Sequence, residues 1–240
     1  MEPGFVSSLD ESVEVIPQIQ QYQSLVGSLL YISRHSRPDI CLSVAILTQF
    51  MNTAQPKHWS AAKRVLRYLY HTRQAKRTLT TMKKDQLMAY CDASWAADKD
   101  DRRSRSGGVI FFNGILLHAW SRKQKTVALS TAEAEYYSMS TAIQNLLFFK
   151  ILLNFLGLLK DKPMVLNVDC RGAIDLGQST KNHDRTKHID LRHHFIRELV
   201  MSHKLVIQYV PTEEQVADAL TKAVTAPKLK RLQNALNIVL

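Results

Sequence analysis

The 240-residue sequence is poor in cysteine, glycine and proline, and it has no long hydrophobic run. Its three cysteines, Cys41, Cys91 and Cys170, are far apart, which excludes a disulfide framework and a Cys-x-x-Cys zinc knuckle. Eight glycines and seven prolines exclude collagen-like and low-complexity classes. The most apolar stretch, residues 143–159, is interrupted by polar side chains and falls short of the roughly 18 residues of a membrane span. The N-terminus lacks the basic and apolar regions of a signal peptide, so we expect a soluble intracellular protein.

Acidic residues are scarce as well, with 21 Asp and Glu against 32 Lys and Arg, a formal net charge of +11. This excess indicates an anionic partner, most commonly nucleic acid, although a basic solubilising surface would give the same total. No acid occurs between Asp39 and Asp85. Within that interval, apolar residues follow helical spacing at Trp59, Ala62, Val65, Leu66, Leu69 and Tyr70. The opposite face, with Lys63, Arg64 and Arg67, is either a phosphate-binding face or a solvated one.

The chain divides near residue 85 into a helical part and a part with strands. Two further helices are expected before the basic one, separated at Arg37-Pro38 because proline ends or kinks a helix. We therefore expect a flexible extension over residues 1–21, a small helical unit over 22–85, an α/β domain over 86–223 and a helical tail over 224–240. A domain of about 150 residues with an appendage suits the length.

The α/β domain is expected to contain five strands. Short apolar runs predict strands at 87–93, 164–169 and 205–210, and the Asn113-Gly114 pair predicts a hairpin of two more. Ser130 followed by Glu133 is a capping box that opens a helix to about Leu156. Shorter helices are expected at 171–178 and 188–203, and a second capping box at 212–215 predicts a helix to about Ala223. The predicted fold class is α/β, with a five-stranded mixed sheet flanked by helices.

Two aspartates stand at strand ends among residues that otherwise look buried. Asp92 lies in YCDASW and Asp169 lies in LNVDC. Either one alone could cap the next turn, but an unpaired buried carboxylate is costly and normally has a cation beside it. Two such residues at the carboxyl ends of separate core strands favour a shared metal site.

Two acids on predicted helices, Glu135 and Asp218, are further candidate ligands of this metal site. Glu135 lies on the same side of its helix as Met139 and so points toward the sheet, whereas Glu133 is explained by the capping box; a surface salt bridge is the alternative for Glu135. Asp218 has polar helical neighbours, and by itself it would belong to a solvated face. Together with Asp92 and Asp169, these acids form an oxygen-rich site for two Mg²⁺ or Mn²⁺ ions, which catalyse attack of water on phosphodiesters.

Five of the nine histidines cluster between residues 181 and 204. Their spacing matches no zinc knuckle and no thiolate joins them, so we expect a basic, partly titratable face along the substrate. They are His183, His188, His193, His194 and His203.

Several strings, in order and at consistent intervals, resemble one family. YCDASWAADKDDRRSRSGGVIFFNG, WSRKQKTVALSTAEAEYYSMSTA, VDCRGAIDL, TKHIDLRHHFIREL and YVPTEEQVADALTK are similar to the ribonuclease H domain at the end of the Pol polyprotein of copia-type LTR retrotransposons. The part containing HWSAAKRVLRYLYHT resembles the thumb and connection region that precedes this domain. The resemblance runs from about Tyr22 to about Ala223.

This resemblance implies a ribonuclease H-like fold that degrades the RNA strand of RNA/DNA hybrids by a two-metal mechanism. It implies that Asp92 bridges both ions, that Glu135 and Asp169 hold one, and that Asp218 holds the other. Other Pol segments are further candidate partners, and a cytoplasmic virus-like particle, or the nucleus, is the implied location. Phosphates of the hybrid would be held by Lys63, Arg64, Arg67, Arg102, Arg103, Arg105, Arg122, Lys123 and Lys125.

The sequence departs from the pattern in two ways. The histidine that many ribonucleases H carry between the last strand and the last helix is absent from YVPTEEQVAD. No Tyr-x-Asp-Asp polymerase motif occurs either, so we expect a Pol fragment without polymerase activity. Two alternatives remain: a non-catalytic nucleic-acid-binding remnant, and an integrase-type strand transferase, which the order Asp, Glu, Asp, Asp disfavours.

Overall fold

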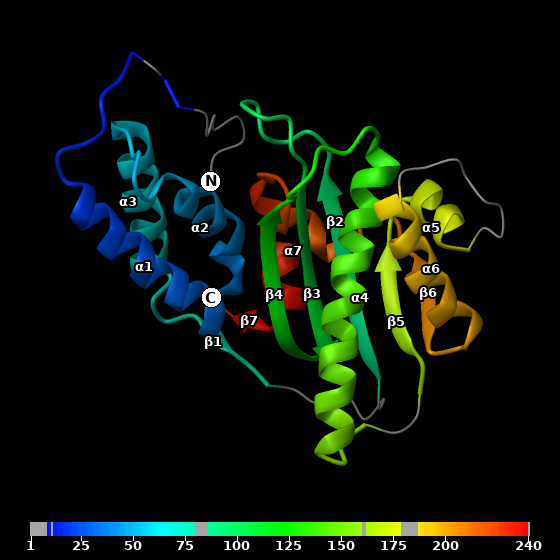
Figure 1. Cartoon of the computed structure of the whole chain (residues 1–240). Coiled ribbons are helices and arrows are strands. Elements are labelled where there is room, and N and C mark those ends of the chain that lie inside the picture. The colour runs from blue at the N-terminus through cyan, green and yellow to red at the C-terminus, as the bar shows by residue number, and fades with distance from the viewer. Residues whose placement is uncertain (1–8, 11, 80–85, 160–161, 179–186, 240) are drawn as a thin grey trace.

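The computed structural model of the chain describes residues 9–10, 12–79, 86–159, 162–178 and 187–239, without the side chains of 176–178 and 187–193. Figure 1 shows a group of helices beside a twisted sheet that has helices on both faces. The elements are α1 (Ile19–His35), α2 (Cys41–Leu47) and α3 (Pro56–His71), then strands β2 to β6 with helices α4 to α6, and finally α7 (Ala226–Ala235). Among the described residues, no helix is both long enough and apolar enough to span a bilayer.

The helical group has its own apolar core. The predicted break at Arg37-Pro38 is confirmed, because α1 ends at His35 and a 3-10 turn, η1 (Pro38–Ile40), leads into α2. A second 3-10 turn, η2 (Thr48–Phe50), follows α2. The three helices bury a shared set of side chains that includes Tyr22, Val26, Leu29, Val44, Leu47, Ala62 and Val65.

The predicted apolar face of α3 is too wide. Ala62, Val65 and Leu69 are buried, as expected, but Leu66 is 46% exposed and Tyr70 is 63% exposed. Successive helical residues are about 100° apart, and only the narrow arc through Ala62, Val65 and Leu69 faces the other helices. The Tyr70 ring packs under the Arg73 guanidinium at the surface instead.

The sheet has the predicted five strands. They are β2 (Leu87–Ser94), β3 (Arg105–Phe112), β4 (Ile115–Lys123), β5 (Met164–Val168) and β6 (Leu205–Tyr209), in the order β4-β3-β2-β5-β6. β2, β3 and β4 are joined antiparallel, whereas β5 runs parallel to both β2 and β6. The turn between β3 and β4 is the predicted one, with positive φ at both Asn113 and Gly114, as a type I′ hairpin turn requires. The sequence therefore predicted the mixed sheet and the ribonuclease H-like fold class correctly.

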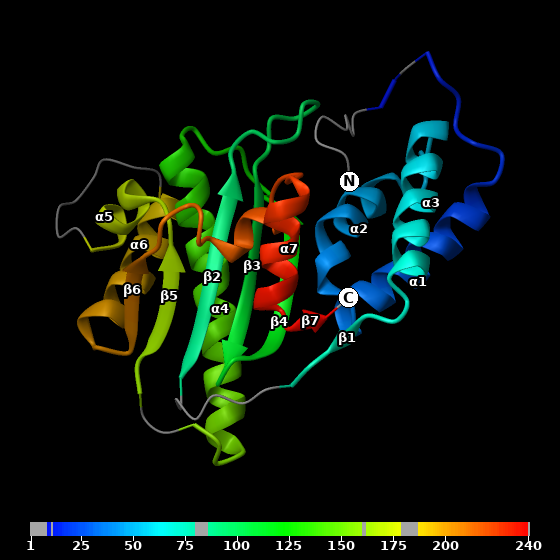
Figure 2. The same cartoon turned by 180° about the vertical axis from the view of Figure 1, so that it is seen from behind.

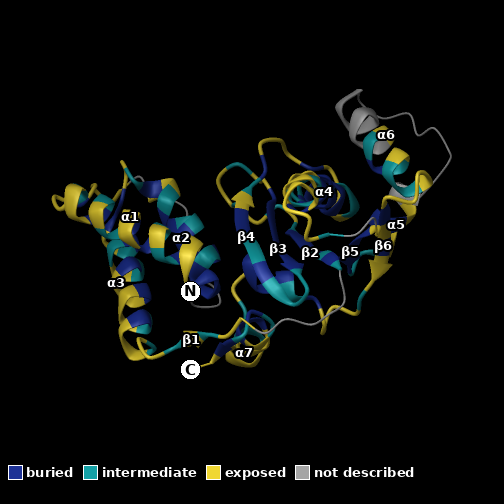
Figure 3. Cartoon of the chain, turned by 90° about the horizontal axis from the view of Figure 1, so that it is seen from below, coloured by how far each residue is buried: buried dark blue, intermediate teal, exposed yellow. Residues whose placement is uncertain are grey.

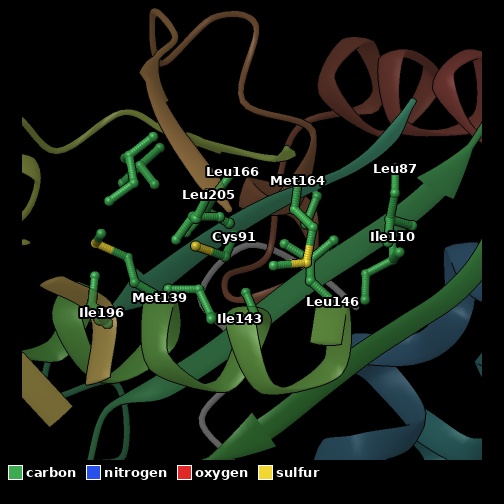
Figure 4. Close-up of a cluster of buried hydrophobic side chains, with 14 of the residues drawn as sticks. Leu87, Cys91, Ile110, Met139, Ile143, Leu146, Met164, Leu166, Ile196 and Leu205 are labelled. Atoms are coloured by element: carbon green, nitrogen blue, oxygen red, sulfur yellow. The ribbon is translucent and has the colours of Figure 1, made fainter. Parts of the chain in front are cut away.

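Helices cover both faces of this sheet. α4 (Thr131–Phe155) crosses one face, near α5 (Arg171–Gln178) and α6 (Lys187–Met201). The opposite face carries α7 and a 3-10 helix, η3 (Val216–Leu220), as the view from behind shows (Figure 2). The core between α4 and the sheet contains an apolar cluster that includes Met139, Ile143, Leu146, Leu166 and Ile196 (Figure 4).

The prediction of an α-helix from a capping box at 212–215 is wrong. The chain there makes turns and then the five-residue η3. Gln215 causes the difference: its side chain accepts from the Ala217 N–H and donates to the Cys91 carbonyl at 3.0 Å, which ties the segment to β2. The Thr212 hydroxyl donates to Asp169 rather than capping a helix.

The helical group and the sheet are joined through the C-terminal residues. β1 (Lys76–Arg77) pairs antiparallel with β7 (Ile238–Val239). A partly buried chain of polar contacts joins them as well: Gln233 of α7 donates to the Tyr68 hydroxyl at 2.6 Å, and Tyr68 donates to Asp39 at 2.5 Å. Asp39 is also held by Arg37 through two hydrogen bonds. These contacts fix α7 between the two groups.

Gly107 of β3 allows η3 to pack closely against the sheet. A Cβ at this position would lie 2.8 Å from Leu220 Cβ and 2.9 Å from its carbonyl carbon and oxygen. Backbone atoms cannot move aside alone, so Gly107→Ala is expected to displace η3 and lower the free energy of unfolding by about 1–3 kcal/mol. Urea denaturation measures this change.

Gly27→Ala is the matched control. Gly27 lies in α1 and a Cβ there would meet no atom within 4 Å. Because alanine favours a helix by about 1 kcal/mol over glycine, this variant is expected to be as stable as the wild type or more so. Equal effects of the two substitutions would contradict the close approach of η3 to β3.

Candidate metal centre and nucleic-acid interface

Three carboxylates meet at one edge of the sheet. Asp92 belongs to β2, Asp169 directly follows β5, and Glu135 is the fifth residue of α4. One oxygen from each lies within 4.8 Å of the other two. β2 and β5 are parallel neighbours, so their carboxyl ends lie at the same edge, and α4 begins there (Figure 1). The convergence expected from the sequence is present for these three residues.

The two glutamates of α4 have the different surroundings that the sequence predicted. Glu133 belongs to the helix start: its N–H donates to the Ser130 hydroxyl at 3.2 Å, and its carboxylate accepts from the Leu129 N–H at 2.7 Å. Glu135 is only 4% exposed. The Ser138 hydroxyl donates to the Asp92 carbonyl at 2.8 Å, which fixes this turn of α4 against β2. Glu135 is thereby held beside Asp92.

The three acids disfavour one another's ionised forms. Burial, with the nearby charges of Asp92 and Asp169, raises the pKa of Glu135 to about 9. Burial also raises the pKa of Asp92, although a hydrogen bond from Thr221 opposes the shift. Glu135 Oε2 is buried and has no hydrogen-bond partner among the described residues. A buried, unpartnered carboxylate oxygen beside two more carboxylates is suited to a divalent cation, whose oxygen ligands these are.

Asp218 lies close by but outside this group of three. It belongs to η3 and is 3% exposed. The solvated position that its polar sequence neighbours suggested is therefore wrong. Two lysines pair with it: Lys222, and Lys228 of α7 at 2.7 Å. Burial lowers the pKa of Lys222, but the pair with Asp218 and the charges of Asp92 and Asp169 outweigh it, and the net shift is upward.

Thr221 links Asp218 to the three carboxylates. Its hydroxyl contacts both the Asp92 carboxylate and the Asp218 carbonyl oxygen. Sequence reasoning missed Thr221 and Lys228 as neighbours of the acids. Thr221 could have been suspected from its position three residues after Asp218. Lys228 is ten residues from Asp218, on another helix, and no local pattern in the sequence points to it.

The predicted basic residues are placed unequally. Seven of the nine are exposed, namely Lys63, Arg64, Arg67, Arg102, Arg103, Arg122 and Lys125. Lys123 is occupied by ion pairs with Asp98 at 2.6 Å and Asp101 at 2.8 Å. Arg105 is only 6% exposed, and burial lowers its pKa. Its guanidinium lies near Asp98 of the β2–β3 loop and Cys41 of α2, so the structure does not place Arg105 where it could meet a phosphate at the surface.

The basic face of α3 lies toward the side of the molecule that holds Asp218. Arg64 and Arg67 line a pocket of about 430 Å³ together with Lys222. Lys222 is the residue that pairs with Asp218, so positive side chains extend from the acidic group to α3. Lys57 also lines this pocket.

The expected histidine face lies mostly outside the described residues. His183 and the side chains of His188 and His193 are not described, while His194 and His203 are exposed. The interpretation of these histidines stays a prediction.

The chain is similar in sequence to retrovirus-related Pol polyproteins of plant transposons. The chain is 39% identical over 210 residues to the retrovirus-related Pol polyprotein from transposon TNT 1-94 of Nicotiana tabacum, which covers 87% of this chain and 16% of that protein. It is 36% identical over 224 residues to the Pol polyprotein from transposon RE2 of Arabidopsis thaliana, covering 93% of this chain and 15% of that protein. The chain thus spans about a sixth of these relatives. No protein-family model matches it.

Among solved structures, the chain is similar to LC11-RNase H1, isolated from compost by a metagenomic approach. The likeness has 20% sequence identity and a TM-score of 0.45, and it covers 57% of this chain and 93% of that one. The same ribonuclease in complex with an RNA/DNA hybrid gives a TM-score of 0.42 at 20% identity, covering 57% of this chain and 94% of that one.

Proposed function

Because the chain belongs to the Pol polyproteins of copia-type retrotransposons, as a C-terminal region with a ribonuclease H-like domain, we propose that it hydrolyses the RNA strand of RNA/DNA hybrids. The observation that carries this proposal is the group of Asp92, Glu135 and Asp169, whose oxygens lie within 4.8 Å of one another. The acids stand on β2, α4 and the end of β5, the elements on which the sequence pattern of the family puts its catalytic carboxylates.

The chemistry of the donors supports divalent cations as the cofactor. Two Mg²⁺ or Mn²⁺ ions held by carboxylates would activate the attacking water and stabilise the leaving 3′ oxygen. Asp92, Glu135 and Asp169 are the residues we assign to the ions, with Asp218 as the fourth ligand. Asp92 stands between Glu135 and the Thr221–Asp218 contact, which suits it to a bridging role.

The protein's own residues prepare this site before any ion binds. The Ser138 hydroxyl and the pairing of β2 with β5 fix the positions of Asp92 and Asp169. Thr221 holds the Asp92 carboxylate, and Lys222 and Lys228 hold Asp218. Fixing charged ligands in advance lowers the reorganisation that the reaction requires. The two lysines also neutralise Asp218 while its carboxylate has no ion.

We assign the exposed basic residues to the substrate. Lys63, Arg64 and Arg67 of α3, with Lys222, would contact phosphates on one side of the acidic group, and Arg102, Arg103, Arg122 and Lys125 would contact them on the other. Such contacts position the duplex without reading its sequence, so the affinity should fall steeply with salt.

The test is cleavage of a labelled RNA/DNA hybrid at millimolar Mg²⁺ by the whole chain. We expect cleavage of the RNA strand alone, loss of cleavage with EDTA, and no cleavage of duplex DNA. Filter binding on the same hybrid separates catalysis from binding. Wild-type protein that binds the hybrid and leaves it intact would instead identify a non-catalytic nucleic-acid-binding protein.

A further inference from the structure

The outer face of α4 changes character along the helix. Residues 134–140 of its first half are all buried, Thr141 is partly exposed, and Gln144 is exposed. From Phe148 onward the same face is apolar and exposed: Phe148 is 61% exposed, Ile151 70% and Phe155 86%. Leu152, Leu156 and Leu158 extend this patch, with 40%, 54% and 55% exposed. We call these six residues the α4 patch.

Within the described part of the chain, the fold does not account for the α4 patch. Ile143, Leu146 and Leu153 pack in the core and are buried on the opposite side of the helix. In the view from below, the near end of α4 is largely exposed, clear of the helical group and of α7 (Figure 3). A solvated helix face normally carries polar residues.

The α4 patch is large enough to be an interface. With an aromatic side chain taken as 150–250 Å², its six residues expose roughly 600 Å². The largest apolar patch on a typical monomer is about 300–600 Å², and a standard interface buries about 800 Å² on each partner.

We propose that the α4 patch joins two copies of this chain across a twofold axis. Phe148, Ile151 and Phe155 form a straight row at helical spacing, and no residue of the patch is charged. Two such rows are self-complementary, because each copy offers the other an uncharged ridge of the same length when the helices pack antiparallel. A strongly basic chain with a net charge of +11 can associate with itself through a surface that carries no charge.

The dimer leaves the acidic group open. Glu135 and Phe155 are twenty residues apart on one helix, which corresponds to roughly 30 Å. The carboxylates lie at the start of α4 and the α4 patch lies at its end. This inference does not depend on the proposed function, since it would hold for a binding protein as well.

Sedimentation equilibrium of the whole chain tests the proposal, after nuclease treatment and at high salt so that nucleic acid cannot bridge two copies. We expect the wild type to dimerise at micromolar concentrations. Phe155→Glu and Ile151→Glu each place a carboxylate from both copies into the contact, and each should weaken dimerisation by at least about 100-fold. Both side chains are exposed, so circular dichroism should match that of the wild type.

Tyr31→Glu is the control, because Tyr31 of α1 is 66% exposed but lies outside the α4 patch. This variant should dimerise as the wild type does. A wild-type protein that is monomeric up to several hundred micromolar would overturn the proposal, and the α4 patch would then belong to a different partner. A dimer that survives both Phe155→Glu and Ile151→Glu would also overturn it, because the contact would lie elsewhere.

Discussion

Asp92→Asn is expected to lower the rate of hybrid cleavage by about 10³-fold or more, since losing one preorganised charged or donor group already costs about 10²–10³ in kcat. The substitution keeps the shape of the side chain and removes its charge. Asp92 is 3% exposed and accepts from the Thr221 hydroxyl, a contact that the asparagine oxygen can retain. The loss should therefore come from weaker cation binding and not from unfolding.

Three measurements together distinguish these causes. Circular dichroism and the melting temperature report the fold, filter binding reports affinity for the hybrid, and a gel assay reports cleavage. We expect Asp92→Asn to retain the fold and most of the affinity. Asp100→Asn, an equivalent change at an exposed position in the β2–β3 loop, should cleave as the wild type does. An Asp92→Asn protein that cleaves at the wild-type rate would remove Asp92 from the catalytic assignment.

The sequence predicts the sheet and the meeting of three acids because both depend on local patterns. Short apolar runs and the Asn113-Gly114 turn define the strands. The capping box at Ser130 separates Glu133 from Glu135 before any tertiary contact is known. Parallel strands end at one edge, so two strand-terminal aspartates are expected to be neighbours.

The remaining contacts depend on tertiary packing and could not be predicted in this way. The second capping box has the right residues, but the Gln215 side chain bonds to Cys91 and the segment folds as η3. Arg105 follows Arg102 and Arg103 in sequence, yet strand pairing directs it into the interior. Lys228 reaches Asp218 from α7, a helix that also carries Gln233 and is followed by β7, which pairs with β1.

Glu135 is expected to make the thermal stability of the cation-free protein depend strongly on pH. Its pKa is raised from 4.5 to about 9 in the folded chain, mainly by burial and then by Asp92 and Asp169. Between these two values the folded chain holds a proton that the unfolded chain has released. Stability therefore falls as the pH rises through this window, and Asp92, whose pKa is also raised, adds a shift of the same sign. In cation-free buffer we expect the melting temperature to fall from about pH 5.5 to about pH 8.5.

Glu135→Gln isolates this contribution. The variant has no proton to lose, so at pH 8.5 it should be more stable than the wild type, by up to a few kcal/mol, and its melting temperature should depend less on pH. His118 contributes the opposite slope near neutral pH, because burial lowers its pKa, but this contribution is the same in both proteins and cancels in their difference. Glu133→Gln, two residues away at the helix start and outside the group of three carboxylates, is the matched control for the substitution.

Divalent cations should reverse the loss of thermal stability at high pH. A cation binds the ionised form of Glu135, so millimolar Mg²⁺ or Mn²⁺ is expected to raise the melting temperature of the wild type more at pH 8.5 than at pH 5.5. Glu135→Gln should show a smaller rise at pH 8.5, because one ligand is gone. Equal slopes of melting temperature against pH in the wild type and Glu135→Gln would mean that Glu135 ionises as it does in water. The same buried charge that destabilises the empty site is thus what gives the site its affinity for a cation, and thermal unfolding measures both without a substrate.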